Sequence, residues 1–296
     1  MMMCNRFSFR TRTLCSLPLL GALLLSGCKF PSPPVVSVTI KSAGGEDEGT
    51  AEVDPDDAGV SGYGTLTGRV TFDGTPPNLT PLVNQGDAGV KDSSVCSIEA
   101  VPDESLEIDP ATKGIGNVVI YLAKPPKYIN PDLASAETDV EPAVFDQKGC
   151  KFFPHILPVR VDLDQPLVVK SDDGIAHNTH TYPQRNSQFN QAVKANDRDG
   201  IPIKYSRAES EPLRVTCDYH SWMKAYHFPI DHPYFAITKP DGTFTIEGLP
   251  AGKHEFKVWQ ERGGLIDRKL EVTINPDETT TIDPAKTTYS PDKFKL

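Results

Sequence analysis

The sequence predicts an all-β fold with long loops. Short segments in which apolar and polar residues alternate recur between clusters of turn residues, and this period is typical of half-buried strands. Beyond the N-terminal segment, no long amphipathic helical pattern occurs. The chain also contains 27 prolines among 296 residues, and proline is poorly tolerated inside helices.

The N-terminal segment, residues 1–27, is predicted to be a signal peptide. Its apolar stretch, residues 14–25, is too short to span a bilayer as a mature helix and follows a basic region with Arg6, Arg10 and Arg12. The stretch ends in Leu-Ser-Gly-Cys28, which resembles the lipobox of bacterial lipoproteins. This resemblance implies that Cys28 becomes the N-terminus and carries acyl chains that anchor the protein to a membrane. An ordinary secretory cleavage near Gly27 is the alternative.

Residues 28–63 are predicted to form a disordered, acidic and proline-rich linker behind the anchor, because they contain too little apolar surface to offset the entropy of ordering. The lipobox resemblance implies an extracytoplasmic, lipid-anchored protein. Lys29, rather than Asp, would follow the lipidated cysteine, so inner-membrane retention is not signalled and the outer membrane is preferred. The net charge of −10 argues against nucleic acid as a partner.

Ordered sequence is predicted from residue 64, where an alternating strand ends in an Asp-Gly turn. Further strands occur at 116–123, around the Pro-Asp-Gly hairpin of 234–252, and at 253–259 and 268–274. This pattern resembles the carboxypeptidase-regulatory, transthyretin-like β-sandwich. In that family the first strands and the hairpin lie close together in sequence, whereas here a long insert separates them. We therefore assign 64–126 and 234–285 to the two parts of one sandwich, and 286–296 to a C-terminal tail.

The insert contains Cys217, His220 and Met223 within seven residues, between strands predicted at 212–217 and 224–230. A thiolate, an imidazole and a thioether suit copper better than calcium or magnesium. Ligands at this spacing cannot all face one side of a straight strand, so they require a loop that wraps around one ion. Cys-x-x-His-x-x-Met resembles the ligand loop of amicyanin and plastocyanin-type cupredoxins. The resemblance implies that residues 127–233 form a cupredoxin-like Greek-key β-sandwich inserted in the first sandwich.

A mononuclear type 1 copper site also needs an upstream histidine. His177 follows an apolar segment and precedes Asn178, as the resemblance to cupredoxins requires. His180 is the rival ligand, and a buried cysteine beside surface histidines is the alternative without metal. His155 with His180 is a candidate for an additional site, although a surface histidine at a strand edge is the simpler interpretation.

Cys96, Cys150 and Cys217 remain once the cysteines of the N-terminal segment are set aside. Their odd number in an oxidising compartment leaves one cysteine without a disulfide partner. If Cys217 is a metal thiolate, Cys96 and Cys150 are available to form a disulfide. A Cys150–Cys217 disulfide is the alternative, and it would abolish the copper site.

The sequence contains no nucleophile elbow, metalloprotease motif or phosphate-binding loop, so we expect no enzyme activity. Two functions are consistent with these observations. The first is a membrane-anchored protein that binds one copper ion for electron transfer or copper handling, with a redox protein as its partner. The family resemblance places His220 near the surface, with Tyr219 and Trp222 in the contact patch. The second is a scaffold lipoprotein without metal that binds carbohydrate or protein.

Overall fold

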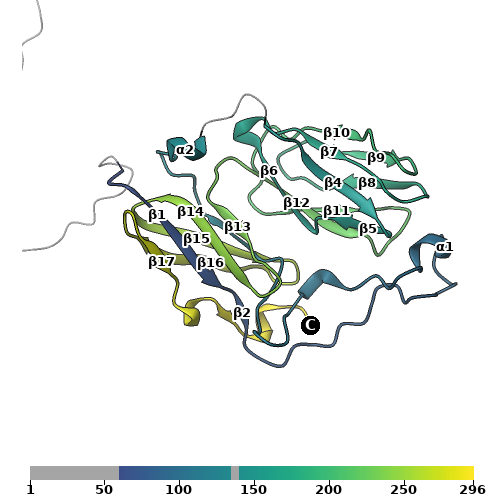
Figure 1. Cartoon of the computed structure of the whole chain (residues 1–296), viewed down its shortest axis with the longest axis horizontal. Helices are drawn as coiled ribbons and strands as arrows, with labels where there is room; N and C mark the ends of the chain where they lie inside the picture. The colour runs from purple at the N-terminus through teal and green to yellow at the C-terminus, as the bar shows by residue number, and fades with distance from the viewer. Residues whose placement is uncertain (1–59, 135–139) are drawn as a thin grey trace, which may run out of the picture. The chain divides into compact units, whose positions relative to one another are not determined.

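The computed structural model describes residues 60–134 and 140–296, which all belong to one compact unit (Figure 1). The described part of the chain consists mostly of β-strands in five sheets, with two single-turn α-helices and short 3₁₀ turns, which confirms the predicted all-β class. The predicted signal peptide, the lipidation site Cys28 and almost all of the predicted linker lie outside the described residues. Within the described residues, no helix has the length and apolar character needed to cross a bilayer.

The first sandwich contains two main sheets around one apolar core. One sheet has the order β14 (Thr243–Pro250), β1 (Tyr63–Arg69) and β17 (Thr279–Thr281). The other has the order β13 (Phe235–Ile237), β3 (Val119–Leu122), β15 (Gly252–Gln260) and β16 (Gly264–Ile274). Alternate residues of β1 and β14, among them Leu66, Phe244 and Ile246, face the core because successive side chains point to opposite faces of a sheet.

The turn between β13 and β14 depends on Gly242. This residue has a φ of +81°, a conformation that residues with a Cβ rarely adopt. A Cβ at this position would lie 2.3 Å from the carbonyl oxygen of Val70 on the neighbouring segment. Asp241 closes the same turn by accepting a hydrogen bond from the backbone N–H of Thr243 at 3.0 Å. The Asp-Gly signal in the sequence therefore marks both a turn and a close backbone contact.

The second sandwich is built from the strands that lie between β3 and β13 in the sequence. One sheet has the order β10 (Ile201–Ile203), β7 (Leu167–Val169), β4 (Ala143–Lys148) and β5 (Lys151–Phe153). The other has the order β6 (Ile156–Arg160), β12 (Lys224–Ile230), β11 (Leu213–Thr216), β8 (His177–Thr181) and β9 (Asn190–Val193). Its core includes Phe145, Val215 and Met223.

A third apolar cluster joins the two sandwiches. Tyr121 of β3 contacts Phe228 of β12 with ring centroids 4.9 Å apart, and Trp259 of β15 contacts Tyr226 of β12 at 4.8 Å. The cluster also contains residues of β6 and β12 that alternate away from the core of the second sandwich, such as Ile156 and Ile230. We call this set the bridging cluster: Val119, Tyr121, Ile156, Tyr226, Phe228, Ile230 and Trp259. Residues of both sandwiches therefore bury apolar surface against one another in this cluster, which the hydrophobic effect favours.

Two segments differ from the sequence prediction. The predicted tail, 286–296, contributes β18 (Thr288–Tyr289), which pairs with β2 (Thr71–Phe72), and the buried Phe294, whose ring lies 5.6 Å from that of Phe72. The segment between β2 and β3 was assigned to the first sandwich. It instead carries α1 (Ser93–Cys96), whose Cys96 is bonded to Cys150 beside β5 (Figure 1). Both segments contain few apolar residues, so their sequences did not predict that they would pack against the strands.

Candidate metal centre

The loop between β11 and β12 presents Cys217 and His220 toward the same point. The backbone N–H of Cys217 donates to the carbonyl of Met223 at 3.2 Å, and that of Met223 donates to the carbonyl of His220 at 2.9 Å. These two bonds close the loop into a tight turn, so that residues three apart face inward together. A straight strand would have separated them onto opposite faces.

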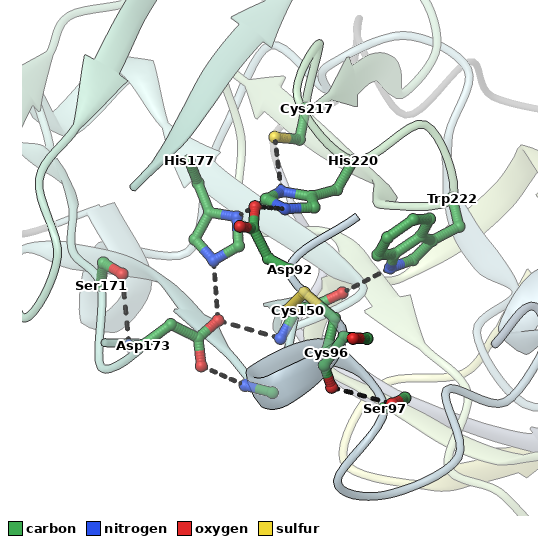
Figure 2. Close-up of a disulfide and its surroundings, with 12 residues drawn as sticks. Asp92, Cys96, Ser97, Cys150, Ser171, Asp173, His177, Cys217, His220 and Trp222 are labelled. Carbon is green, nitrogen blue, oxygen red and sulfur yellow. Dashed lines mark hydrogen bonds and ion pairs between the residues drawn. A yellow bond between two sulfur atoms is a disulfide. The ribbon is translucent and has the colours of Figure 1, made fainter. Parts of the chain in front are cut away.

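Three potential ligand atoms converge beneath this loop (Figure 2). The Nδ1 atoms of His177 and His220 lie 3.0 Å apart, and the Sγ atom of Cys217 lies 3.7 Å from the Nδ1 of His220. Ligand atoms of all three residues lie within 4.8 Å of one another. His177 and His220 are 0% exposed and Cys217 is 2% exposed. The structure therefore brings these three predicted ligands to one buried point.

The outer nitrogen of each histidine is held by a carboxylate. The Nε2 of His177 donates to Asp173 at 2.8 Å, and the Nε2 of His220 donates to Asp92 at 2.9 Å (Figure 2). A carboxylate on one ring nitrogen fixes the tautomer and orientation of an imidazole and raises the basicity of the other nitrogen. Both rings consequently direct their Nδ1 atoms toward the common point. The sequence analysis identified neither aspartate.

Asp173 is itself tightly held. It accepts hydrogen bonds from the backbone N–H groups of Gly149 at 2.6 Å and Cys150 at 2.9 Å. Burial opposes the charge on Asp173, but these bonds and the one from His177 outweigh it, so the pKa of this carboxyl lies below its usual value. The carboxylate is therefore charged and available to orient His177 at neutral pH.

The surroundings of Cys217 favour a thiolate. Burial opposes its ionisation, but hydrogen bonds from His177, His220 and the backbone N–H groups of Asn178 and Tyr219 lower the pKa of Cys217 to about 6. Burial also opposes the charge on His177, yet Asp173 and the Cys217 sulfur raise the pKa of this imidazole to about 8. The thiolate is the form of cysteine that binds metals. The lowered pKa of Cys217 and the raised pKa of His177 therefore favour a thiolate beside the His177 imidazolium.

Asn178 ties the ligand loop to β8. Its backbone N–H lies 3.5 Å from the Cys217 sulfur, and its side-chain oxygen accepts a hydrogen bond from the backbone N–H of Asp218 at 2.6 Å. Its amide also donates to the Asp218 carboxylate at 2.9 Å. These contacts fix Cys217 relative to His177, which lies on the same strand as Asn178. Met223 is buried in the core of the second sandwich, at the end of the loop.

The rival ligand His180 lies in a different environment. It is three residues beyond His177 on β8, so the alternation of the strand directs it to the opposite face. Its Nδ1 lies 3.0 Å from the Asp218 carboxylate, and its Nε2 lies 2.6 Å from the Gln188 amide. In the part of the chain that the structure describes, His180 belongs to neither of the two groups of residues that could hold a metal.

His155 likewise lies apart from the three converging ligands. Its Nε2 donates to Glu261 at 2.7 Å, and its Nδ1 lies 3.6 Å from Glu104. Glu261 is also paired with Lys224. His155 and His180 are therefore held by separate sets of partners, and the described residues offer no metal-binding group that includes either histidine.

Two further expectations concern exposure and the disulfide. The family resemblance placed His220 near the surface, but it is 0% exposed because Asp92 covers its outer nitrogen; this expectation was wrong. Tyr219 is 40% exposed, as a contact residue would be. Cys96 and Cys150 form a disulfide, and Cys217 is free and buried, so the alternative Cys150–Cys217 bond is not formed.

Comparisons with known proteins give weak similarities. No family model and no curated protein matches the chain. Among solved structures, a Cu-containing nitrite reductase from Thermus scotoductus is 15% identical over 35% of this chain and 27% of its own, with a TM-score of 0.30. The chain thus spans about a quarter of that reductase. Amicyanin from Paracoccus versutus is 13% identical over 38% of this chain and 97% of its own, with a TM-score of 0.27. A purple cupredoxin from Nitrosopumilus maritimus is 14% identical over 30% and 99%, with a TM-score of 0.24.

Proposed function

We propose that this chain is an extracytoplasmic, lipid-anchored protein that binds one copper ion and transfers electrons. The observation that carries the proposal is the convergence of the Nδ1 atoms of His177 and His220 with the Cys217 sulfur at one buried point. Two imidazoles and a thiolate form a donor set that suits copper. Their geometry and chemistry, rather than the weak similarity to known structures, support the assignment.

Each residue would have a distinct role. Cys217, His177 and His220 would be the strong ligands, and Met223 would be a weak axial donor. Bound copper would supply one-electron redox chemistry. The carboxylates of Asp173 and Asp92 would hold the two imidazoles in place, so that little rearrangement accompanies a change in the charge of the site.

Electron transfer is favoured over copper delivery by the burial of the site. All three strong ligands are almost completely covered, and a disulfide fixes the chain beside them. A delivery protein must release its ion to a partner, which requires ligands within reach of the partner's own. A buried and pre-oriented site retains its ion instead. The redox partner would then be another protein outside the cytoplasm.

The anchor and the first sandwich complete the proposal. The Leu-Ser-Gly-Cys28 sequence supports lipidation at Cys28, with the linker of residues 28–63 as a tether outside the cytoplasm. The split strand order and the Asp-Gly turn support a transthyretin-like class for the first sandwich. We propose no enzyme activity for either sandwich.

The test is a copper titration of the protein without residues 1–28, purified in its disulfide form. The wild-type protein should bind one copper ion and absorb strongly in the visible range when oxidised, because the Cys217 thiolate transfers charge to copper. Cys217→Ser and His177→Ala should abolish the colour, whereas His180→Ala is the matched control and should retain it. A protein that stays colourless with copper, or that binds only zinc, would refute the proposal.

A further inference from the structure

One disulfide lies between the two carboxylates that hold the histidines. Cys150 donates its backbone N–H to Asp173, which holds His177, and Cys96 donates its backbone N–H to the carbonyl of Asp92, which holds His220. Figure 2 shows Asp92 against the lower side of the His220 ring and Asp173 below the His177 ring, with the disulfide next to both aspartates. A single covalent bond therefore links the supports of both imidazoles.

Asp92 is placed by its backbone rather than by neighbouring side chains. It adopts the left-handed conformation, with φ 53° and ψ 40°, at the start of α1. Such a conformation is costly for a residue with a Cβ, and it persists only where the surrounding structure holds it. The turn of α1 supplies this support. The backbone N–H of Cys96 donates to the carbonyl of Asp92 at 2.9 Å, and the Cys96 side chain forms the disulfide with Cys150.

Asp92 also forms the boundary between His220 and water. Its side chain is 36% exposed, whereas that of His220 is 0% exposed. On the other side of the ring, Trp222 lies 5.3 Å from His220 and donates its indole N–H to the carbonyl of Cys150 at 3.2 Å. Cys150 is thus bonded to residues on two sides of the His220 ring: its sulfur is bonded to Cys96, and its carbonyl accepts the hydrogen bond from Trp222.

We propose that residues 92–96 form a disulfide-held cover over His220, in which Asp92 is the positioning residue for this ligand. The cover fixes the His220 ring with Nδ1 directed inward and excludes water from its outer edge. Its role for a bound ion rests on the proposed function, namely retention of copper, but the cover itself exists in the metal-free protein. Asp92 does not contact the ion and acts only through His220.

The first experiment needs no metal. Metal-free protein is treated with diethyl pyrocarbonate, and modification of His220 is followed by peptide mass mapping. His220 should be protected in the wild-type protein and should react about tenfold faster or more in Asp92→Ala, because a charge-assisted hydrogen bond is lost. Asp92→Asn keeps an acceptor oxygen and should restore most of the protection. Asp87→Ala removes an aspartate of the same segment whose carboxylate accepts a hydrogen bond from the backbone N–H of Gly89, and should match the wild type.

The second arm tests the disulfide. Dithiothreitol reduces Cys96 and Cys150 to two thiols, with two electrons and two protons, and is itself oxidised to its cyclic disulfide. His220 should then become as reactive as in Asp92→Ala, while circular dichroism shows that the strands are retained. If His220 is equally protected in Asp92→Ala and in the wild type, the cover does not exist and the inference is wrong.

The final readout is copper release to the Cu(I) chelator bicinchoninate. Loss of a carboxylate behind a histidine ligand typically weakens metal binding by about 10- to 100-fold, so Asp92→Ala should release copper faster by a comparable factor. Wild-type protein that binds no copper, but whose His220 protection depends on Asp92, would refute the proposed function and leave the cover standing. Copper release unchanged by Asp92→Ala would refute the positioning role.

Discussion

Phe228→Ala tests whether the bridging cluster makes the two sandwiches unfold as one unit. Phe228 is 0% exposed, and its ring contacts Tyr121 at 4.9 Å and Phe235 at 6.3 Å, both on strands of the first sandwich. Truncating a buried phenylalanine costs about 3–5 kcal/mol, because transfer energy is lost and a cavity remains. Since Phe228 contacts both sandwiches, we expect the substitution to reduce mainly the interaction free energy between them, rather than the stability of either sandwich alone.

The assay uses the two tryptophans of the chain as separate probes. Trp222 lies in the ligand loop of the second sandwich, and Trp259 lies on β15 of the first. Trp259→Phe and Trp222→Phe variants leave one probe each, and because Trp259 belongs to the bridging cluster, each single-tryptophan variant is the reference for its own Phe228→Ala derivative. In urea both probes should give the same midpoint, whereas after Phe228→Ala the two midpoints should separate.

Phe256→Ala is the matched control, since Phe256 is equally buried but lies in the core of the first sandwich. It should lower the stability without separating the two probes. If Phe228→Ala lowers both midpoints together, the coupling does not depend on the bridging cluster. The same outcome would follow if the disulfide alone joined the sandwiches, so the experiment is repeated under reducing conditions.

Three further predictions concern other parts of the chain. Burial lowers the pKa of His227 to about 3, so the unfolded state binds more protons below pH 6.5. About 2 kcal/mol of stability should be lost between pH 7 and pH 5, and urea midpoints of His227→Gln should depend less on pH. The Cys96–Cys150 bond spans 54 residues, so its removal should cost about 4 kcal/mol, measured by urea unfolding with and without reductant. Gly242→Ala would place a Cβ 2.3 Å from a carbonyl oxygen and should lower the stability by about 1–3 kcal/mol, seen as a lower melting temperature.

The strands and the ligand loop could be predicted because their signals are local in sequence. Alternation identified β11, β12 and β15 to within two residues of their observed ends. The spacing of Cys217 and His220 required a loop, and backbone bonds close that loop in the structure. The sequence analysis preferred His177 to His180 from its position before Asn178, and strand register separates the two, because they point to opposite faces of β8.

The supports of the ligands could not be predicted in the same way. Asp173 is four residues before His177 and was visible within an Asp-rich segment, but nothing in its spacing distinguished it from neighbouring acids in an acidic chain. Asp92 lies 128 residues from His220, in a segment without a recognisable pattern. The expectation that His220 is exposed failed for this reason, since its cover comes from a distant loop.

The position of that loop also shows that the inserted segment does not contain every residue that builds the candidate site. The predicted boundaries assign the candidate metal ligands to residues 127–233, as though that segment were a complete unit. Asp92 and Cys96, however, lie between β2 and β3, outside those boundaries. An isolated segment would therefore lose the carboxylate on His220 and leave Cys150 as a thiol, in a group with Asp173 and His177 whose ligand atoms lie within 4.8 Å. A second thiolate near the site would favour other metals and other geometries. The segment between β2 and β3 thus does more than connect two strands of the first sandwich, because it supplies the cysteine that leaves the candidate site with one free thiol.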